Sequence, residues 1–364
     1  MSLSPLQERL ALLVKASGDP DKKQNLLTKN SDVPVLTSGR PFSFKVDRLD
    51  LLRTLYLFCA VTVSTGATPG TPGARVRMPS EWGTLQVYIN GALEFQVNAD
   101  LAFCLAQLFR RQMPLPIDSI TNAELAAGST TPSGAISIPI DFDLPLTFPK
   151  IFGAVPAGNA NVTNISVQGT APAVANLMDS PGATQAISAL ALTPYIERAL
   201  DPHVGIKNHP GFGAAWRRAQ SVTVPSTGFV TMRFDAGRAY MGIALRCTGG
   251  ATNAASDAIL TAGQLIQVKA NGVPVWEGEA SKLALDTAAM LPASFPRTGF
   301  YYIDLLQGAP YDVQASIRAG NADLEFVFHG TTTTNAAVDA CPIVLADILD
   351  TAQGRGLNPA MYGA

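Results

Sequence analysis

The sequence is poor in charge and has no excess of positive charge. Charged residues make up 15% of the 364 residues, and 26 Lys and Arg face 28 Asp and Glu, for a formal net charge of −2. A protein that binds nucleic acid on its own normally has a basic excess, because neutralising phosphates drives its affinity. The hydrophobic content of 47% argues against intrinsic disorder. With so little charge, it also indicates that apolar surface is buried between subunits.

Long apolar runs and paired cysteines are missing as well. No stretch reaches the ~18 consecutive apolar residues of a transmembrane helix, and the N-terminus lacks the charged-then-apolar pattern of a signal peptide. We therefore expect a soluble protein that is not secreted. No C-x-x-C pair occurs, and all four cysteines lie in apolar runs. We expect free buried thiols and no disulfide framework; these are Cys59, Cys104, Cys247 and Cys341.

Histidine is scarce, and the three that occur do not form a set with metal-ligand spacing. His203 and His209 stand in a segment rich in Pro and Gly, and His329 ends a strand-like run. The sequence has no phosphate-binding loop and no nucleophile elbow. Asp141 and Asp143 could serve a glycosidase as two carboxylates on one strand face, but no aromatic groove residues accompany them. We therefore expect a solvated strand face there, and no catalytic residue, metal site or cofactor.

One cluster combines an aromatic side chain with positive charge. "AAWRRAQ" at 214–220 places Trp216 beside Arg217 and Arg218. These side chains could touch phosphate or an anionic lipid surface. Because Trp and Arg are enriched at protein interfaces, we expect an anchor between subunits or domains instead.

The chain contains one short pattern twice. "LQVYINGALEF" at 85–95 and "IQVKANGVPVW" at 266–276 share Gln-Val, two spacer residues, Asn-Gly and then apolar alternation. One constant offset relates Gln86 to Gln267 and Asn90 to Asn271. Asn-Gly between alternating runs predicts a hairpin with a type I′ turn. A helical pattern follows each hairpin, at 99–112 and at 279–291.

The strands before the two hairpins correspond too. "FKVD" at 44–47 aligns with "MRFD" at 232–235, and Cys59 aligns with Cys247, both at a second and slightly longer constant offset. The repeated order of alternating strand, long apolar strand, hairpin and helix indicates one all-β unit used twice in tandem. A unit of roughly 150 residues with about eight strands fits a jelly roll, in which each sheet turns one face inward.

Proline restricts the place of one further strand. "AISIPIDFDLPLTF" at 135–148 alternates clearly, which predicts a strand. Because proline cannot donate to a ladder, Pro139 and Pro145 exclude a central position in a sheet or mark bulges.

We predict five segments along the chain. They are an N-terminal arm (1–36), a first jelly roll (37–198), a linker (199–214), a second jelly roll (215–350) and a C-terminal tail (351–364). The arm has an amphipathic helix, because its apolar residues follow a helical stripe: Leu6, Leu10, Leu13 and Val14. The fold class is therefore all-β, with two tandem eight-stranded jelly rolls, short helices in the connections and an N-terminal helical arm.

Three stretches are similar to parts of one protein family. "ISIPIDFDLPLTFPKIFG" (136–153) is similar to a first-barrel strand that leads into a helical excursion. "FPRTGFYYIDLL" (295–306) is similar to a late second-barrel strand, and "ADLEFVFHGTTTTNAAVDACPIVLADIL" (322–349) to a closing strand pair. With the two jelly rolls and the arm, these stretches resemble the double-jelly-roll major capsid proteins of tectivirus- and adenovirus-type icosahedral shells. The resemblance covers the layout from about residue 37 to 350.

The resemblance implies a structural protein and not an enzyme. In that family three subunits form a nearly hexagonal capsomer, so we expect a homotrimer in the virion shell of a bacterial or archaeal virus, made in the host cytoplasm. Its expected partners are neighbouring capsomers, with penton and minor capsid proteins, and it needs no small-molecule substrate. In many members the shell encloses a membrane. The arm suits contact with membrane or genome, because five basic residues there outnumber Glu8, Asp19 and Asp21: Arg9, Lys15, Lys22, Lys23 and Lys29.

Two other classes compete with this interpretation. A carbohydrate-binding β-sandwich, such as a tail, spike or lectin-like protein, would need clustered exposed aromatic residues, whereas Trp82, Trp216 and Trp276 are scattered along the chain. The other common phage shell fold needs a long spine helix, and no helical pattern here is long enough.

Overall fold

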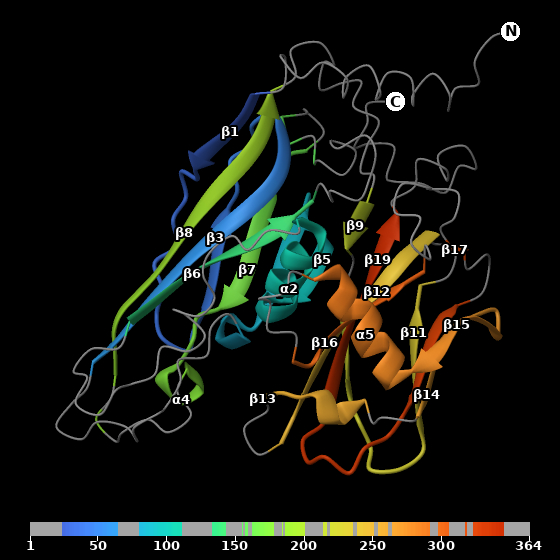
Figure 1. Cartoon of the computed structure of the whole chain (residues 1–364). Helices are drawn as coiled ribbons and strands as arrows, with labels where there is room; N and C mark the ends of the chain where they lie inside the picture. Colours follow the sequence, from blue (N-terminus) through green and yellow to red (C-terminus); the bar gives the residue numbers. More distant parts are fainter. Residues whose placement is uncertain are drawn as a thin grey trace, which may run out of the picture.

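The computed structural model describes residues 24–64, 80–110, 133–142, 155, 157–158, 162–177, 184, 186–200, 214–216, 219–235, 239–250, 254–260, 264–291, 298–305, 317–318 and 323–345. These residues form two β-sandwiches side by side, one from each half of the chain (Figure 1).

The first sandwich has eight strands in two antiparallel sheets of four. Sheet A has the order β1 (Gln24–Lys29), β8 (Ala186–Leu200), β3 (Leu51–Ser64) and β6 (Ser133–Asp141). Sheet B has the order β2 (Pro41–Lys45), β7 (Ile165–Thr170), β4 (Thr84–Ile89) and β5 (Ala92–Asn98). Three helical segments accompany these sheets: η2 (Ser80–Trp82), α2 (Ala99–Arg110) and α4 (Val174–Leu177).

The second sandwich repeats this plan. Sheet C contains β10 (Gln220–Thr223), β19 (Ala337–Leu345), β12 (Ala239–Gly249) and β16 (Phe300–Asp304), in that order. Sheet D contains β11 (Phe229–Phe234), β18 (Leu324–His329), β14 (Leu265–Ala270) and β15 (Val273–Glu279). Three short strands add to sheet C: β9 (Ala214–Trp216), β13 (Ala254–Ala255) and β17 (Ile317–Arg318). The helices here are η4 (Asp257–Ile259) and α5 (Ala280–Met290).

The strand order of each sandwich is that of a jelly roll. When the three short strands are set aside, the first, third, sixth and eighth strands of each sandwich share one sheet, and the other four share the opposite sheet. This is the eight-stranded double-sheet arrangement. The predicted fold class, two tandem jelly rolls, is confirmed.

β-Bulges occur at equivalent places in the two sandwiches. In the hairpins the extra residues are Glu94 and Val275, which are related by the same offset as Asn90 and Asn271. In the long strands β3 and β12 the extra residues are Arg53 and Met241, which are related by the same offset as the aligned cysteines. Both sequence offsets are therefore confirmed by the positions of the bulges. A β-bulge is a specific feature of a sheet and not a random defect.

Both Asn-Gly turns have the expected conformation. The φ angles are 52° and 81° at Asn90 and Gly91, and 55° and 78° at Asn271 and Gly272. Two successive positive φ angles are what a type I′ turn requires. The turns join β4 to β5 and β14 to β15, and α2 and α5 follow with 12 and 11 residues, as predicted.

The interior of each sandwich is filled by the alternate residues of its strands. In β2, for example, Phe42 and Phe44 are buried while Ser43 is exposed. Burying a large apolar side chain in this way contributes about 1.5–3 kcal/mol. All four cysteines are buried free thiols, as their apolar surroundings predicted.

The strand that carries Pro139 lies where this proline predicted. β6 is the last strand in the order of sheet A, and Pro139 stands in it opposite Tyr56. Ile140 and Phe142 are fully buried, so the inward face of the alternation is correct.

The structure corrects the boundary of the N-terminal arm. β1 lies within the range 1–36 assigned to the arm, yet it pairs with β8 along its whole length. Its sequence, QNLLTK, lacks a clean alternation, so the pattern gave no strand signal. Strand structure also continues to Leu200 and resumes at Ala214, inside the range 199–214 predicted as a linker.

In the described part of the chain, no helix is long and apolar enough to cross a membrane.

Several predictions concern residues outside the described part. The side chains of Asp141 and Trp216 are not described. The other residues and segments concerned are 1–23, Asp143, Pro145, His203, His209, Arg217, Arg218 and 351–364.

Candidate assembly surfaces

Helix α2 lies between the two sandwiches and packs on both (Figure 1). A single cluster of buried side chains joins the interior of the first sandwich to the outward face of sheet C. We call this contact the seam. The residues that the second half of the chain contributes to it are Met241, Ala244, Leu291, Phe300, Tyr302, Cys341 and Ile343. The two jelly rolls therefore share a core.

Strand β12 is buried on both faces because of the seam. Ile243, Leu245 and Cys247 point into the core of the second sandwich, whereas Ala244 points into the seam. A strand with one face in water alternates apolar and polar residues, while a strand covered on both sides reads as a continuous apolar run. This explains the uninterrupted "AYMGIAL" of β12.

The seam contains a buried ion pair. Arg246 of β12 pairs with Asp100 in the first turn of α2, and each side chain is only 11% exposed. Nη1 of Arg246 also donates to the carbonyl oxygen of Thr298 at 2.6 Å. A buried charge needs such partners, because desolvating an ion costs several kcal/mol. A carboxylate in the first turn of a helix is also favoured by the helix dipole.

A second carboxyl group stands beside this pair. Asp339 of β19 is the cross-strand neighbour of Arg246. Burial raises the pKa of Asp339, and this outweighs the opposing effects of a hydrogen bond with Ser221 and of the positive Arg246. The seam therefore holds one arginine between two carboxyl groups.

Other polar groups in the seam are inert. Gln107 of α2 is fully buried, and neither polar atom of its amide has a hydrogen-bond partner among the described residues. Burial, with the nearby charge of Asp100, strongly raises the pKa of the Cys104 thiol. A thiol that stays protonated is a poor nucleophile. The groups of the seam hold structure together and do not form a reactive centre.

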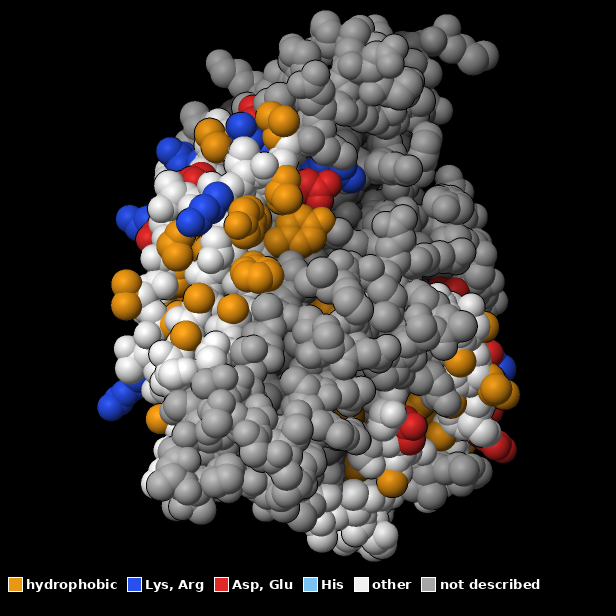
Figure 2. All heavy atoms as spheres, turned by 60° about the vertical axis from the view of Figure 1, so that its left-hand side comes forward, with side chains coloured by type: hydrophobic (Ala, Val, Ile, Leu, Met, Phe, Trp, Pro, Cys, Tyr) orange, Lys and Arg blue, Asp and Glu red, His pale blue; other side chains and the backbone are white. Residues whose placement is uncertain are grey.

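The outward face of sheet A is apolar and accessible. Phe58, in the middle of β3, is 38% exposed, and hydrophobic side chains gather over this side of the molecule (Figure 2). At the rim, the Tyr56 hydroxyl donates to Oε2 of Glu197 at 2.8 Å. We call the centre of this surface the Phe58 face, and its residues are Phe58, Ala60, Ala191 and Thr193.

Helix α5 also exposes an apolar side chain. One side of the helix packs on β15 and β16, but Leu285 on the other side is 72% exposed. Ser281 and Ala288 lie about one turn before and after it and are exposed too. We call these three residues the Leu285 stripe.

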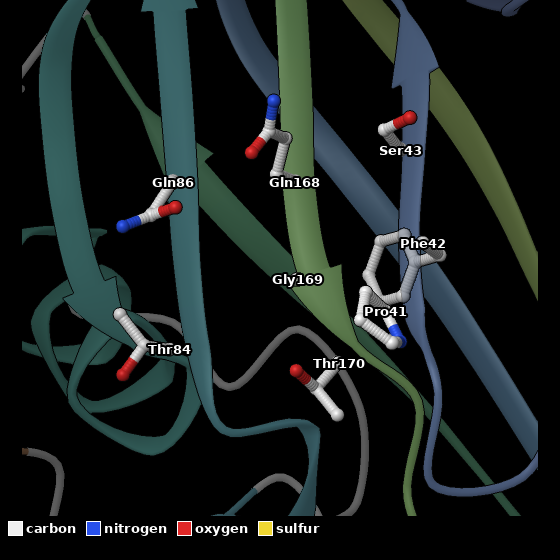
Figure 3. A pocket seen from close by; sticks show the side chains of 8 residues that line it. All are labelled: Pro41, Phe42, Ser43, Thr84, Gln86, Gln168, Gly169 and Thr170. Carbon is white, nitrogen blue, oxygen red and sulfur yellow. The ribbon is translucent and has the colours of Figure 1, made fainter.

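A pocket of about 510 Å³ lies on the outward face of sheet B (Figure 3). Ser43, Gln168 and Gln86 form a row across three strands there, and Nε2 of Gln86 donates to Oε1 of Gln96 at 3.1 Å. The lining offers hydroxyl and amide groups but no acid, base or metal ligand; it consists of Pro41, Phe42, Ser43, Thr84, Gln86, Gln168, Gly169 and Thr170.

The aromatic residues in the described part do not form the platform of a carbohydrate site. Trp82 is fully buried, and Trp276 is half-buried in the other sandwich. Phe229 is 67% exposed, and its ring centroid lies 4.0 Å from that of His329, which ends β18 as predicted. Among the described residues, no cluster of three His, Cys, Asp or Glu could hold a metal ion.

No family model and no curated protein matches the sequence. Solved structures match over almost its whole length. The chain has 12% identity and a TM-score of 0.63 with the major capsid protein of Sulfolobus turreted icosahedral virus, covering 92% of this chain and 100% of that one. The major capsid protein of bacteriophage PM2 gives 12% identity, a TM-score of 0.51 and the same coverages of 92% and 100%. VP54 of PBCV-1 has 11% identity and a TM-score of 0.59, and the match covers 88% of this chain and 93% of that one. At such identities the similarity shows a shared fold, and the resemblance found in the sequence is confirmed at that level.

Proposed function

We propose that this chain is the major capsid protein of an icosahedral virus and that three copies form a pseudo-hexameric capsomer in the virion shell. The observation that carries the proposal is the pair of jelly rolls joined into one body by α2. The same fold extends over 92% of the chain in a viral major capsid protein. The exposed Phe58 face and Leu285 stripe give such a protein apolar surface for assembly.

Duplication gives this fold a geometric use. A ring of three copies contains six jelly rolls, so that threefold symmetry produces a nearly sixfold outline that can tile a shell. Closed rings are the common form of soluble oligomers. The apolar surface that is buried between copies contributes about 25 cal/mol per Å² to association, before the entropic and desolvation costs of association are subtracted.

Residues 1–23 are the second part of the proposal. They precede β1 and contain Arg9, Lys15, Lys22 and Lys23 against Glu8, Asp19 and Asp21, a basic excess of one. Lys29, the fifth basic residue of the range 1–36, belongs to β1. We therefore assign these residues to assembly between neighbouring capsomers on the inner side of the shell, where membrane or genome lies. Deleting residues 2–20 leaves β1 intact, and we expect trimers that no longer form shells of uniform size.

Native mass spectrometry of the purified full-length protein tests the capsomer. We expect a non-covalent trimer at micromolar concentration, and hexagonal particles in negative-stain electron microscopy. A monomer under these conditions would overturn the proposal.

A second measurement addresses enzyme activity. We expect no turnover of glycans by the purified protein. Turnover that the substitution Asp141→Asn abolishes would contradict a purely structural role.

A further inference from the structure

The two surfaces that meet in the seam, α2 and the outward face of sheet C, each have an exposed counterpart elsewhere in the chain: the Leu285 stripe of α5 and the Phe58 face of sheet A. The bulges at Arg53 and Met241 and the buried pair Cys59 and Cys247 align β3 with β12 at one constant offset. Phe58 therefore corresponds to Arg246. In β12 this position lies in the seam, covered by α2, while in β3 it is 38% exposed.

The helices correspond in the same way. The hairpin bulges and the Asn-Gly turns align α2 with α5 at the offset of the two hairpins. The Leu285 stripe therefore occupies the positions of Asp100, Cys104 and Gln107. These three residues share one face of α2, since they follow the spacing i, i+4, i+7, and that face contacts sheet C through Asp100. They are buried, whereas the stripe on α5 is exposed.

We propose that α5 of one copy packs on the Phe58 face of a second copy, and so repeats between copies the seam that α2 makes with sheet C inside each chain. The inference rests on the proposed function, because a closed ring gives every α5 a partner. Each chain has one such helix and one such face, which makes the contact head-to-tail. In a ring of three copies, three seams within chains alternate with three seams between copies.

The seam within the chain and the seam between copies differ in chemistry, and this difference disfavours α5 at the place of α2. Within the chain, the centre holds the ion pair of Arg246 with Asp100. Between copies, the corresponding positions hold Phe58 and Ser281, with Leu285 one turn further along the helix. Two apolar surfaces can close without a buried charge. An α5 placed on sheet C instead would leave Arg246 without the carboxylate that Asp100 supplies from α2, and such mismatches are how interfaces exclude wrong partners.

Site-directed crosslinking tests the contact directly. The protein carries Leu285→Cys and Phe58→Cys in the same chain and is treated with a short bis-maleimide. The four native cysteines are all buried and give little background. We expect covalent dimers and trimers from the double variant, and only monomers on a denaturing gel from either single variant. A native trimer that yields no crosslink would overturn the inference and leave the proposed function standing. A wild-type monomer would overturn both.

Charge substitutions give an independent measurement. We expect Leu285→Arg and Phe58→Arg each to abolish the trimer in native mass spectrometry, with unchanged circular dichroism, because both sites are at the surface. Val273→Arg is the matched control, because Val273 lies beside the hairpin turn of the second sandwich, which also contains Leu285, and is 63% exposed. The Val273→Arg variant should still form trimers. Combining Leu285→Asp with Phe58→Lys in one chain should restore trimers that Leu285→Asp alone lacks. Trimers that persist in both arginine variants would contradict the contact.

Discussion

Arg246 and Asp100 come from different halves of the chain and form an ion pair in the seam between the two jelly rolls. One residue belongs to the central strand β12 of the second sandwich, and the other to the first turn of α2. Around them the seam is largely apolar. The pair therefore supplies a directional contact where hydrophobic packing alone would tolerate sliding.

Removing one partner of this pair should be costly. We expect Arg246→Ala to lower the free energy of unfolding by about 3–5 kcal/mol, because Asp100 is left buried without a counter-charge. The surface pair of Lys282 and Asp286 on α5 is the control, with side chains 58% and 39% exposed, and Lys282→Ala should cost about 0.5 kcal/mol or less. Urea unfolding measures both.

Replacing the whole pair should cost much less than breaking it. When Arg246→Met is combined with Asp100→Leu, the loss should be well below the sum of the two single losses, because neither member of the pair is left as an unpaired buried charge. Additive losses would show that the two side chains act independently.

The stability of the protein should depend on pH through Asp339. Burial raises the pKa of this carboxyl group in the folded state, so the folded protein holds the proton more tightly than the unfolded chain, whose Asp titrates near ~3.9. The stability that protonation provides is present below about pH 4 and is lost as the pH rises through the raised pKa. We expect Asp339→Asn to melt at a higher temperature than the wild type at pH 7, and the difference to shrink at pH 4. A difference that is independent of pH would contradict this account.

Two glycines with positive φ should differ in their tolerance of alanine. Gly299 has a φ of +66°, and an added Cβ would overlap the carbonyl oxygen of Cys247 and lie 2.8 Å from the backbone nitrogen of Ser256. Gly91 has a φ of +81° and nothing within 4 Å of the added atom. We expect Gly91→Ala to cost only the left-handed backbone, about 1–2 kcal/mol, and Gly299→Ala to add roughly 1–3 kcal/mol of overpacking. Equal losses in urea unfolding would show that the close approach at Gly299 relaxes freely.

The duplicated turns offer a matched pair of asparagines. Asn90 and Asn271 share a positive φ, but Oδ1 of Asn90 also accepts hydrogen bonds from the backbone nitrogen of Thr163 at 2.7 Å and of Asn164 at 3.3 Å. In the described part of the chain, the side chain of Asn271 has no such partner. Asn90→Ala should therefore destabilise the protein by roughly 1 kcal/mol more than Asn271→Ala. Differential scanning calorimetry of the two variants can measure this difference, and identical melting temperatures would contradict it.

Much of the fold could be predicted from short stretches of sequence. The Asn-Gly turns, the alternation of β2 and the edge position of Pro139 are local, because turn chemistry and the two-residue period of a strand involve only neighbouring residues. The tandem duplication was also visible, since equivalent strands and hairpins keep a constant offset. The strand β1 could not be predicted, because QNLLTK becomes a strand by pairing with β8 and has no pattern of its own.

The candidate surfaces depended on the tertiary structure. α2 and α5 follow equivalent hairpins and both have helical patterns, yet the described side chains of α2, from Ala99 to Leu108, are all buried, while α5 exposes Leu285. Arg246 and Phe58 hold equivalent strand positions, but only Arg246 is covered by a helix. The two jelly rolls could be predicted because the necessary signals repeat within each half of the chain. Which faces are covered and which remain open could not be predicted, because burial depends on contacts between residues that lie far apart in the sequence.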